Sequence, residues 1–267
     1  MPHHLIDVCD ASDVYSAARF VEDADAAIAA IAARGKIPMV VGGTGLYIRS
    51  LVSGLFDVPQ DATVRARLRE RAAREGVSRL HTELERVDPD CARKVGQRDA
   101  LRVIRALEVY QTTGRPMSEW QRSHALAERR YPALRITLSR PRSQLRDRIA
   151  VRAKAMLDAG LVAEVEALLA AGVARDAPPM RAIGYSEAIQ HLDGGLERSE
   201  LWAAITASTR RFSKRQLTWF RGQWESCWMD MNEPRVESTL AAAISTFVDS
   251  GVEIEFGASD DSEWRNR

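Results

Sequence analysis

The sequence feature that most constrains the fold is a short apolar run that ends in a glycine-rich turn and then becomes helical. Residues 37–41 read Ile-Pro-Met-Val-Val, Gly42 and Gly43 follow, and apolar residues recur at helical spacing from Leu46 to Leu51. A strand, a tight loop and a helix together form the repeating unit of helix-covered parallel sheets. The sequence therefore predicts an α/β protein in which residues 37–41 form a strand.

Other segments supply the further elements of such a core. Helical spacing predicts helices at residues 15–34, 143–159, 161–171, 199–221 and 236–249, and apolar runs predict strands at 135–138 and 227–229. Gly35 is expected to cap the first helix. Every element predicted between Pro59 and Tyr131 is helical. We therefore expect a helical insertion domain at 59–132, between core parts at 1–58 and 133–250, followed by a tail at 251–267.

Composition places the chain among globular proteins of the cytoplasm. Its 267 residues are 45% hydrophobic and 28% charged, and the longest apolar runs fall short of the roughly 18 residues that cross a bilayer. Cys9, Cys91 and Cys227 are odd in number and widely spaced, which argues against a disulfide framework or a zinc finger. We expect three reduced thiols and a cytoplasmic protein.

The net charge of +1 hides two basic segments. One contains Arg65, Arg67, Arg69, Arg71 and Arg74, and the other runs from Leu201 to Trp224 without an acidic residue. In the second, Arg211, Lys214, Arg215 and Thr218 share one helical face, while Leu217, Phe220 and Trp224 form a stripe that we expect to be buried. Positive charge beside aromatic residues is typical of RNA contact, although here packing in the core explains the aromatic residues better.

The turn Gly42-Gly43-Thr44-Gly45 has two readings. Where a strand turns into a helix, backbone amides and the Thr44 hydroxyl would face an anion. The alternative is a plain turn whose glycines supply positive φ angles. The pattern does not match GxGxxG, so a dinucleotide site is not expected.

Two further motifs also leave alternatives open. In residues 98–108, Leu101, Ile104 and Leu107 are predicted to face a core, and the arginines on the neighbouring face suit either a phosphate backbone or pairing with acidic residues. In residues 181–185, the turn could present Arg181 and Tyr185 at a cleft, or Ile183 could simply pack in the core. At the N-terminus His3, His4 and Asp7 are too few for a metal site, and no protein ligand for a metal is predicted.

Seven segments in collinear order resemble one enzyme family. They are PHHLID, YSAARF, VVGGTGLY, RDALRVIRALEVY, TGRP, RAIGY and TRRFSKRQLTWFR, and they extend from Met1 to about Trp224. Each is weak by itself, but their order and spacing together make chance similarity implausible. The chain resembles the bacterial tRNA dimethylallyltransferase (isopentenyl-tRNA transferase) family.

The resemblance implies a fold and a reaction. The fold would be a P-loop NTPase-like core with a parallel sheet and an all-α insertion domain. The reaction would transfer a dimethylallyl group from dimethylallyl diphosphate to the exocyclic amine of the adenosine just 3′ of the anticodon in tRNA, with Mg²⁺ assisting the leaving diphosphate. The adenine would be flipped out of the anticodon loop. We expect an RNA- and nucleotide-binding enzyme that acts as a monomer and has no membrane partner.

The resemblance also assigns residues. Thr44 and Arg152 are implied as catalytic residues, with Thr44 at the junction of adenine, prenyl group and diphosphate and Arg152 on the diphosphate. The implied tRNA contacts are Thr44, Arg65, Leu101, Arg102, Val103, Ile104, Arg105, Arg181, Ala182, Ile183, Gly184, Tyr185, Ser186, Lys214, Arg215 and Gln216.

One departure from the family pattern is serious. The family's phosphate loop and its general-base aspartate precede the segment that matches PHHLID, and GxxxxGK[ST] does not occur in these 267 residues. We therefore expect that the native chain starts upstream, that this chain has little or no activity by itself, and that its sheet leaves apolar surface open. An inactive tRNA-binding remnant is the alternative. A nucleotide-kinase relative would share the core but not the basic helix.

Overall fold

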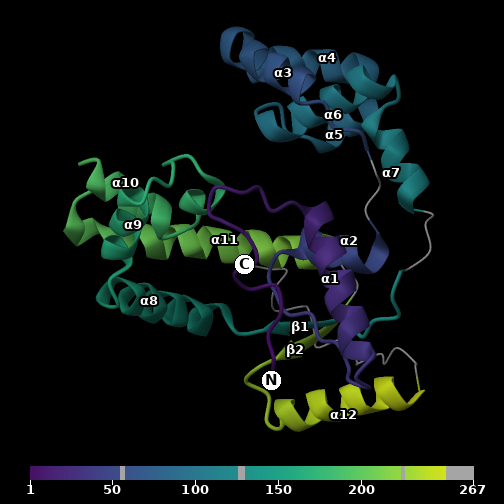
Figure 1. Ribbon diagram of the computed structural model, residues 1–267, viewed down its shortest axis with the longest axis vertical. Coiled ribbons are helices and arrows are strands. Elements are labelled where there is room, and N and C mark those ends of the chain that lie inside the picture. Colours follow the sequence, from purple (N-terminus) through teal and green to yellow (C-terminus); the bar gives the residue numbers. More distant parts are fainter. Residues whose placement is uncertain (55–57, 126–129, 224–225, 251–267) are drawn as a thin grey trace. The chain divides into compact units, whose positions relative to one another are not determined.

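The computed structural model describes residues 1–54, 58–125, 130–223 and 226–250 (Figure 1). The chain forms two compact units: the larger contains Met1–Val52 and Tyr131–Arg267, and the smaller contains Ser53–Arg130. The domain ranges expected from the sequence remain a prediction. In the described residues, no helix is both long and apolar enough to span a bilayer.

The larger unit combines helices with two short strands. Its elements are α1 (Ala17–Ala32), α2 (Gly45–Ser53), β1 (Ile136–Ser139), α8 (Arg142–Asp158), α9 (Leu161–Ala170), η1 (Pro178–Arg181), α10 (Tyr185–Leu192), η2 (Arg198–Glu200), α11 (Leu201–Gln223), β2 (Cys227–Asp230) and α12 (Val236–Ser250). Strands β1 and β2 pair in parallel, with Ile136 opposite Cys227 and Ser139 opposite Asp230. The two strands lie within one residue of their predicted positions.

The third predicted strand, residues 37–41, is wrong. The segment has an irregular backbone, and within the described residues it forms no backbone hydrogen bond. A strand exists only when another strand pairs with its amides and carbonyls, and local sequence does not supply that partner. Most of its apolar side chains are exposed, up to 85% for Val41.

Helix α1 begins and ends within two residues of its prediction. The Ser16 hydroxyl accepts a hydrogen bond from the Arg19 amide and caps the N-terminus. The predicted cap at Gly35 is confirmed. Gly35 has φ +64°, its amide donates to the Ala32 carbonyl, and the Lys36 amide donates to the Ile31 carbonyl, which is the glycine-terminated C-cap.

Helix α11 is the longest of the described elements, and other helices of the larger unit pack on it. It packs against α8 and α10 (Figure 1). Ala153 of α8, Leu161 of α9 and Ile205 of α11 form one buried cluster, and a second cluster joins α9 to α10 through Val165 and Ala188. Helix α10 was not predicted, because its eight residues follow a glycine and a short 3₁₀ turn rather than a long periodic run.

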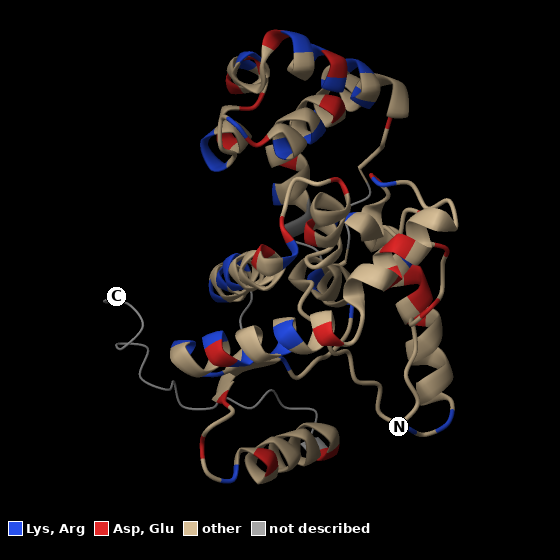
Figure 2. Ribbon diagram, turned by 90° about the vertical axis from the view of Figure 1, so that its left-hand side faces the viewer, with Lys and Arg blue, Asp and Glu red and all other residues tan. Residues whose placement is uncertain are grey.

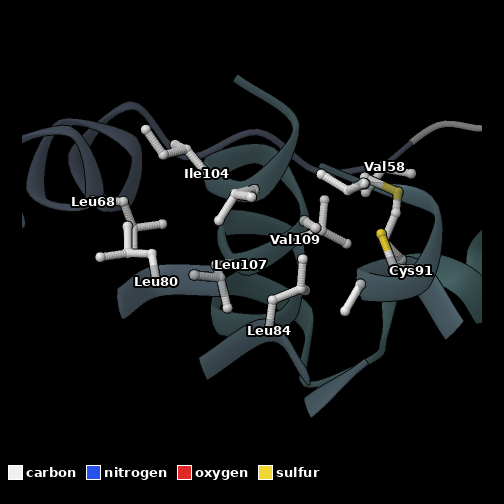
Figure 3. Close-up of a cluster of buried hydrophobic side chains, with 13 residues drawn as sticks. Val58, Leu68, Leu80, Leu84, Cys91, Ile104, Leu107 and Val109 are labelled. Atoms are coloured by element: carbon white, nitrogen blue, oxygen red, sulfur yellow. The ribbon is translucent and has the colours of Figure 1, made fainter. Parts of the chain in front are cut away.

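The smaller unit is a bundle of five helices in its described residues. They are α3 (Ala62–Glu75), α4 (Val77–Val87), α5 (Pro89–Lys94), α6 (Ala100–Thr113) and α7 (Met117–Ala125). Leu68, Leu80, Leu84 and Leu107 are wholly buried and point toward one another (Figure 3). Burial also raises the pKa of the Cys91 thiol to about 11, so this cysteine stays protonated at neutral pH.

Candidate active site and RNA-binding surface

The turn of residues 42–45, here named the Thr44 loop, is held by the second half of α11. The Gln216 side-chain amide donates a hydrogen bond to the Gly43 carbonyl over 3.1 Å. Three residues further along α11, the Trp219 ring lies against Gly45, and the Arg49 guanidinium of α2 sits 5.8 Å from that ring. The loop and the helix, distant in sequence, form one local structure.

Close approach, rather than positive φ, requires the glycines of the Thr44 loop. None of Gly42, Gly43 and Gly45 has a positive φ, so the alternative in which these glycines supply positive φ angles is wrong. A Cβ on Gly45 would lie 2.1 Å from the Trp219 ring, and one on Gly43 would lie 2.1 Å from the Gln216 amide nitrogen. A Cβ on Gly42 would meet open space. Two glycines therefore let α11 close onto the loop.

Thr44 stands exposed immediately before α2. Its carbonyl accepts hydrogen bonds from the amides of Tyr47 at 2.9 Å and Ile48 at 3.3 Å, which fixes the first turn of the helix. Helix α2 is fixed in turn by the Tyr47 hydroxyl, which donates to the Tyr15 carbonyl, and by the Tyr47 ring stacked on Phe20. The first amides of a helix have no acceptor within it and attract anions. Together with the Thr44 hydroxyl, they can hold a phosphate group.

The basic face of α11 is exposed as predicted. Arg211, Lys214, Arg215 and Thr218 are all exposed, and the Arg215 guanidinium lies 5.6 Å from the exposed ring of Phe212. The predicted buried stripe is wrong in degree, because Leu217 and Phe220 are only partly buried. Trp224 lies outside the described residues. The helix thus presents cations and partly open aromatic rings to solvent, a combination suited to RNA.

Arg152 lies on an exposed position of α8. It forms no hydrogen bond or ion pair with the part of the chain that the structure describes, so its guanidinium is available to an anion. Among the described residues, no hydrogen bond joins the two residues implied as catalytic.

The structure supports the packing interpretation of residues 181–185, and presentation of Arg181 and Tyr185 at a cleft stays a prediction. Arg181 is exposed and donates to the Asp176 carbonyl, whereas Ile183 packs against the cluster around Ile205. Gly184 has φ +99°, and a Cβ there would meet Leu161 at 3.3 Å, so glycine is required. This segment exposes one cation from a rigid turn.

The Tyr185 hydroxyl is already engaged. It donates a short hydrogen bond to the Glu164 carboxylate, which together with burial raises the pKa of Tyr185 to about 12. The phenol is therefore neutral at physiological pH. Its ring packs between the two core clusters of the unit.

The buried carboxylate of Glu187 holds the turn of residues 184–186 in place. It accepts hydrogen bonds of 2.8 Å from the Gly184 amide and the Ser186 hydroxyl. Burial raises the pKa of Glu187, but these bonds and one from Ser208 of α11 outweigh burial and hold the pKa below its ordinary value. The carboxylate thereby ties residues 184–186 to the basic helix.

In the smaller unit, the expectation for residues 101–105 is partly wrong. Ile104 and Val103 are buried, but Leu101 is 78% exposed, because its position falls on the solvent side of α6 rather than toward the core. Arg102 pairs with Asp99 at 2.9 Å, and Arg98 is exposed. Figure 2 shows basic and acidic residues alternating on the helices of this unit. Pairing with acids and exposure of cations therefore occur on the same helix.

Arg65 and Arg105 converge on one buried acid, Glu108. Arg65 donates from Nε at 2.9 Å and from Nη2 at 3.0 Å, and Arg105 donates from Nη1 at 3.0 Å. The Asp61 amide completes the set at 3.0 Å. Burial raises the pKa of Glu108, but these partners outweigh burial and keep the pKa below its ordinary value.

Sequence reasoning missed the residues that support the site. The sequence could have indicated the pairing of Glu108, since it lies three residues after Arg105 on a predicted helix. The indication for Trp219 was weaker: it lies three residues after Gln216. The contact of Trp219 with Gly45 joins distant segments, and no local pattern could reveal it.

Comparisons with known proteins agree on one family. The family model described as IPP transferase matches residues 1–223. A protein of Trichlorobacter lovleyi named tRNA dimethylallyltransferase 1 is 46% identical over 248 residues, which are 92% of this chain and 81% of that protein. A protein of Stenotrophomonas maltophilia named tRNA dimethylallyltransferase is 44% identical over 92% of this chain and 80% of its own length.

Solved structures show the same fold. The tRNA isopentenylpyrophosphate transferase of Bacillus halodurans has a TM-score of 0.63 and 34% identity, covering 93% of this chain and 77% of that one. A eukaryotic dimethylallyltransferase described as acting on tRNA has a TM-score of 0.75 and 26% identity, covering 98% and 70%. The predicted α/β class with a helical part is thereby confirmed.

The contact between Trp219 and Gly45 yields a first prediction. Alanine in the middle of a helix normally stabilises it relative to glycine by about 0.5–1 kcal/mol, and Gly45 is the first residue of α2. Because a Cβ on Gly45 would overlap the Trp219 ring, we expect Gly45→Ala instead to destabilise the larger unit by about 1–3 kcal/mol, measured by urea unfolding. Gly42→Ala is the matched control and should change little. Stabilisation by Gly45→Ala would show that the ring does not constrain the loop.

The lowered pKa of Glu187 yields a prediction about acid. Its contribution to stability is present above the ordinary glutamate pKa of about 4.5 and is lost as the pH falls through the lower folded value. We expect Glu187→Gln to cost about 1–3 kcal/mol at pH 7 and progressively less below pH 4.5. Unfolding measured across this range checks it, with exposed Glu166→Gln as control. A difference in unfolding free energy between the wild type and Glu187→Gln that grows as the pH falls would contradict the assignment.

Proposed function

The chain belongs to the IPP transferase family, and we propose that it transfers a dimethylallyl group from dimethylallyl diphosphate to the exocyclic amine of the adenosine 3′ of the anticodon in tRNA. One observation carries the proposal in this chain's own residues. Thr44 is exposed at the N-terminus of α2, and the preceding residue, Gly43, accepts a hydrogen bond from Gln216 of the basic, acid-free helix α11. An anion-binding turn and an RNA-binding helix thus share one support.

In the proposed reaction, the carbon–oxygen bond of the allylic diphosphate breaks and a carbon–nitrogen bond to the adenine amine forms. The diphosphate leaves with the bonding electrons, and the amine gives up one proton to a base. Negative charge therefore develops on the leaving group. The Thr44 hydroxyl and the first amides of α2 would stabilise that charge, with Arg152 as a further cation.

Magnesium is proposed as the ion that accompanies the diphosphate. The described residues contain no group of three or more His, Cys, Asp or Glu side chains suited to a metal. Mg²⁺ at phosphate sites usually needs only one or two protein ligands, since phosphate oxygens and water supply the rest. When bound, the ion would neutralise part of the leaving group's charge, and no protein ligand is assigned to it here.

The tRNA contacts proposed for the larger unit lie on α11 and on residues 181–186. Lys214 and Arg215 would contact phosphates, and Arg181 would add a cation from a rigid turn. In the smaller unit, Arg65 and the segment from Leu101 to Arg105 would contact the same RNA. We propose that the protein binds RNA as a monomer in the cytoplasm.

The proposed role of Thr44 is tested by transfer of the labelled prenyl group. With the protein expressed from its chromosomal gene and then purified, we expect Thr44→Val to lower kcat about a hundredfold, because a stabilising donor is lost. Thr44→Ser keeps the hydroxyl and should retain most activity. Equal rates for wild type and Thr44→Val would exclude Thr44 from the chemistry.

The proposed role of α11 is tested by tRNA binding to the 267-residue chain. We expect Lys214→Ala to weaken binding about threefold to tenfold and to reduce the slope of log K against log salt by roughly 0.7–0.9, because one phosphate contact is lost. Lys154→Ala, on the exposed face of α8, is the matched control and should leave both unchanged. An unchanged slope in Lys214→Ala would show that the helix does not contact phosphate.

A further inference from the structure

The environment of Glu108 is unusual for a helix residue. Its side chain has no exposed surface, and its neighbours Leu107 and Val109 are wholly buried as well. Each of its partners comes from the region around the start of α3 or from α6 itself: the Asp61 amide, Arg65 and Arg105. A carboxylate has therefore been placed in the hydrophobic core of the smaller unit and fully bonded there.

Stability alone does not explain such a residue. Moving a carboxylate out of water is expensive, and well-packed apolar residues often stabilise a core as well as a buried ion pair or better. What the network does achieve is to fix two long, flexible side chains. The side chains of Arg65 and Arg105 remain 31% and 28% exposed, so their contact with Glu108 does not bury either of them completely.

The guanidinium groups of Arg65 and Arg105 also donate hydrogen bonds to acceptors other than Glu108. Arg65 also donates to the Gln60 side chain at 3.1 Å, and Arg105 donates to the carbonyls of Val58 and Pro59. Nη1 of Arg65 has no hydrogen-bond partner among the described residues. Each arginine is thus oriented by several hydrogen bonds, and the Nη1 group of Arg65 remains available to a further acceptor.

We propose that Glu108 is a positioning residue for RNA binding: its buried carboxylate orients the partly exposed side chains of Arg65 and Arg105 so that they meet successive phosphates. This inference rests on the proposed function, which supplies the RNA. Pre-oriented guanidinium groups lose less rotamer freedom on binding than free ones do. The network of two cations and one anion keeps a net charge of +1 for the phosphates.

The sign of the change in tRNA affinity caused by Glu108→Gln distinguishes positioning from simple electrostatics. Glu108→Gln removes a negative charge next to the proposed RNA contacts, so electrostatics alone predicts tighter binding. Loss of orientation predicts weaker binding. Measuring tRNA affinity for the 267-residue chain against salt concentration distinguishes the two.

We expect Glu108→Gln to bind tRNA about tenfold more weakly, with a slope of log K against log salt that is shallower by roughly 0.7–1.8, because one or two phosphate contacts are lost. Glu119→Gln is the matched control: it removes the acid that pairs with exposed Arg115 in the same unit, and it should not weaken binding. Binding by Glu108→Gln that is unchanged or tighter overturns the inference.

Two further variants separate positioning from a general loss of structure. In an Arg65→Ala background, Glu108→Gln should have a smaller effect than in the wild type, because it acts through that arginine. Full additivity overturns the inference. Arg65→Lys keeps the charge but cannot make the two-point contact, so it should bind as weakly as Glu108→Gln and serves if that variant does not fold. Wild-type binding by Arg65→Lys also overturns the inference.

Binding of tRNA by the wild-type chain distinguishes failure of the positioning inference from failure of the proposed function. If the wild type binds tRNA with steep salt dependence and the Glu108 variant binds equally well, only the positioning inference fails. If the wild type itself does not bind tRNA, the proposed function fails and the inference fails with it.

Discussion

The proposed active site depends on the close approach of α11 to the Thr44 loop. Gly43 and Gly45 leave no Cβ in the way, so Gln216 reaches a backbone carbonyl and Trp219 packs against the first residue of α2. The same helix carries the exposed Lys214 and Arg215 on its basic face. One element therefore holds both the turn proposed to bind the diphosphate and the surface proposed for RNA, which matters because prenyl transfer needs donor and acceptor in a fixed geometry.

Two buried carboxylates support the rest of the proposed RNA surface. Glu187 fixes the turn that exposes Arg181, and Glu108 fixes Arg65 and Arg105 in the other unit. Both acids are deprotonated at neutral pH because their hydrogen bonds outweigh burial. An exposed arginine samples many rotamers, so a buried partner that limits them can contribute to recognition more than to stability.

Local patterns predicted much of the fold but little of its long-range support. Helical spacing placed α8, α9, α11 and α12 within about two residues, since an apolar stripe is a property of the segment itself. The strand at residues 37–41 was wrong because pairing depends on a distant segment. Leu101 was misplaced because periodicity does not say where a buried face ends. Of the candidate residues, Gln216 was named for tRNA, and its contact with Gly43 became visible only in the fold.

The most direct measurement is hydrogen–deuterium exchange of the 267-residue chain with and without a tRNA anticodon stem-loop. If the Thr44 loop and α11 form one RNA-binding support, the RNA should protect residues 44–49 and 210–221 together, along with residues 101–105, and leave α12 unchanged. Protection confined to α12, or absent from α11, would contradict the assignment of the basic helix and the turn it holds to a shared site.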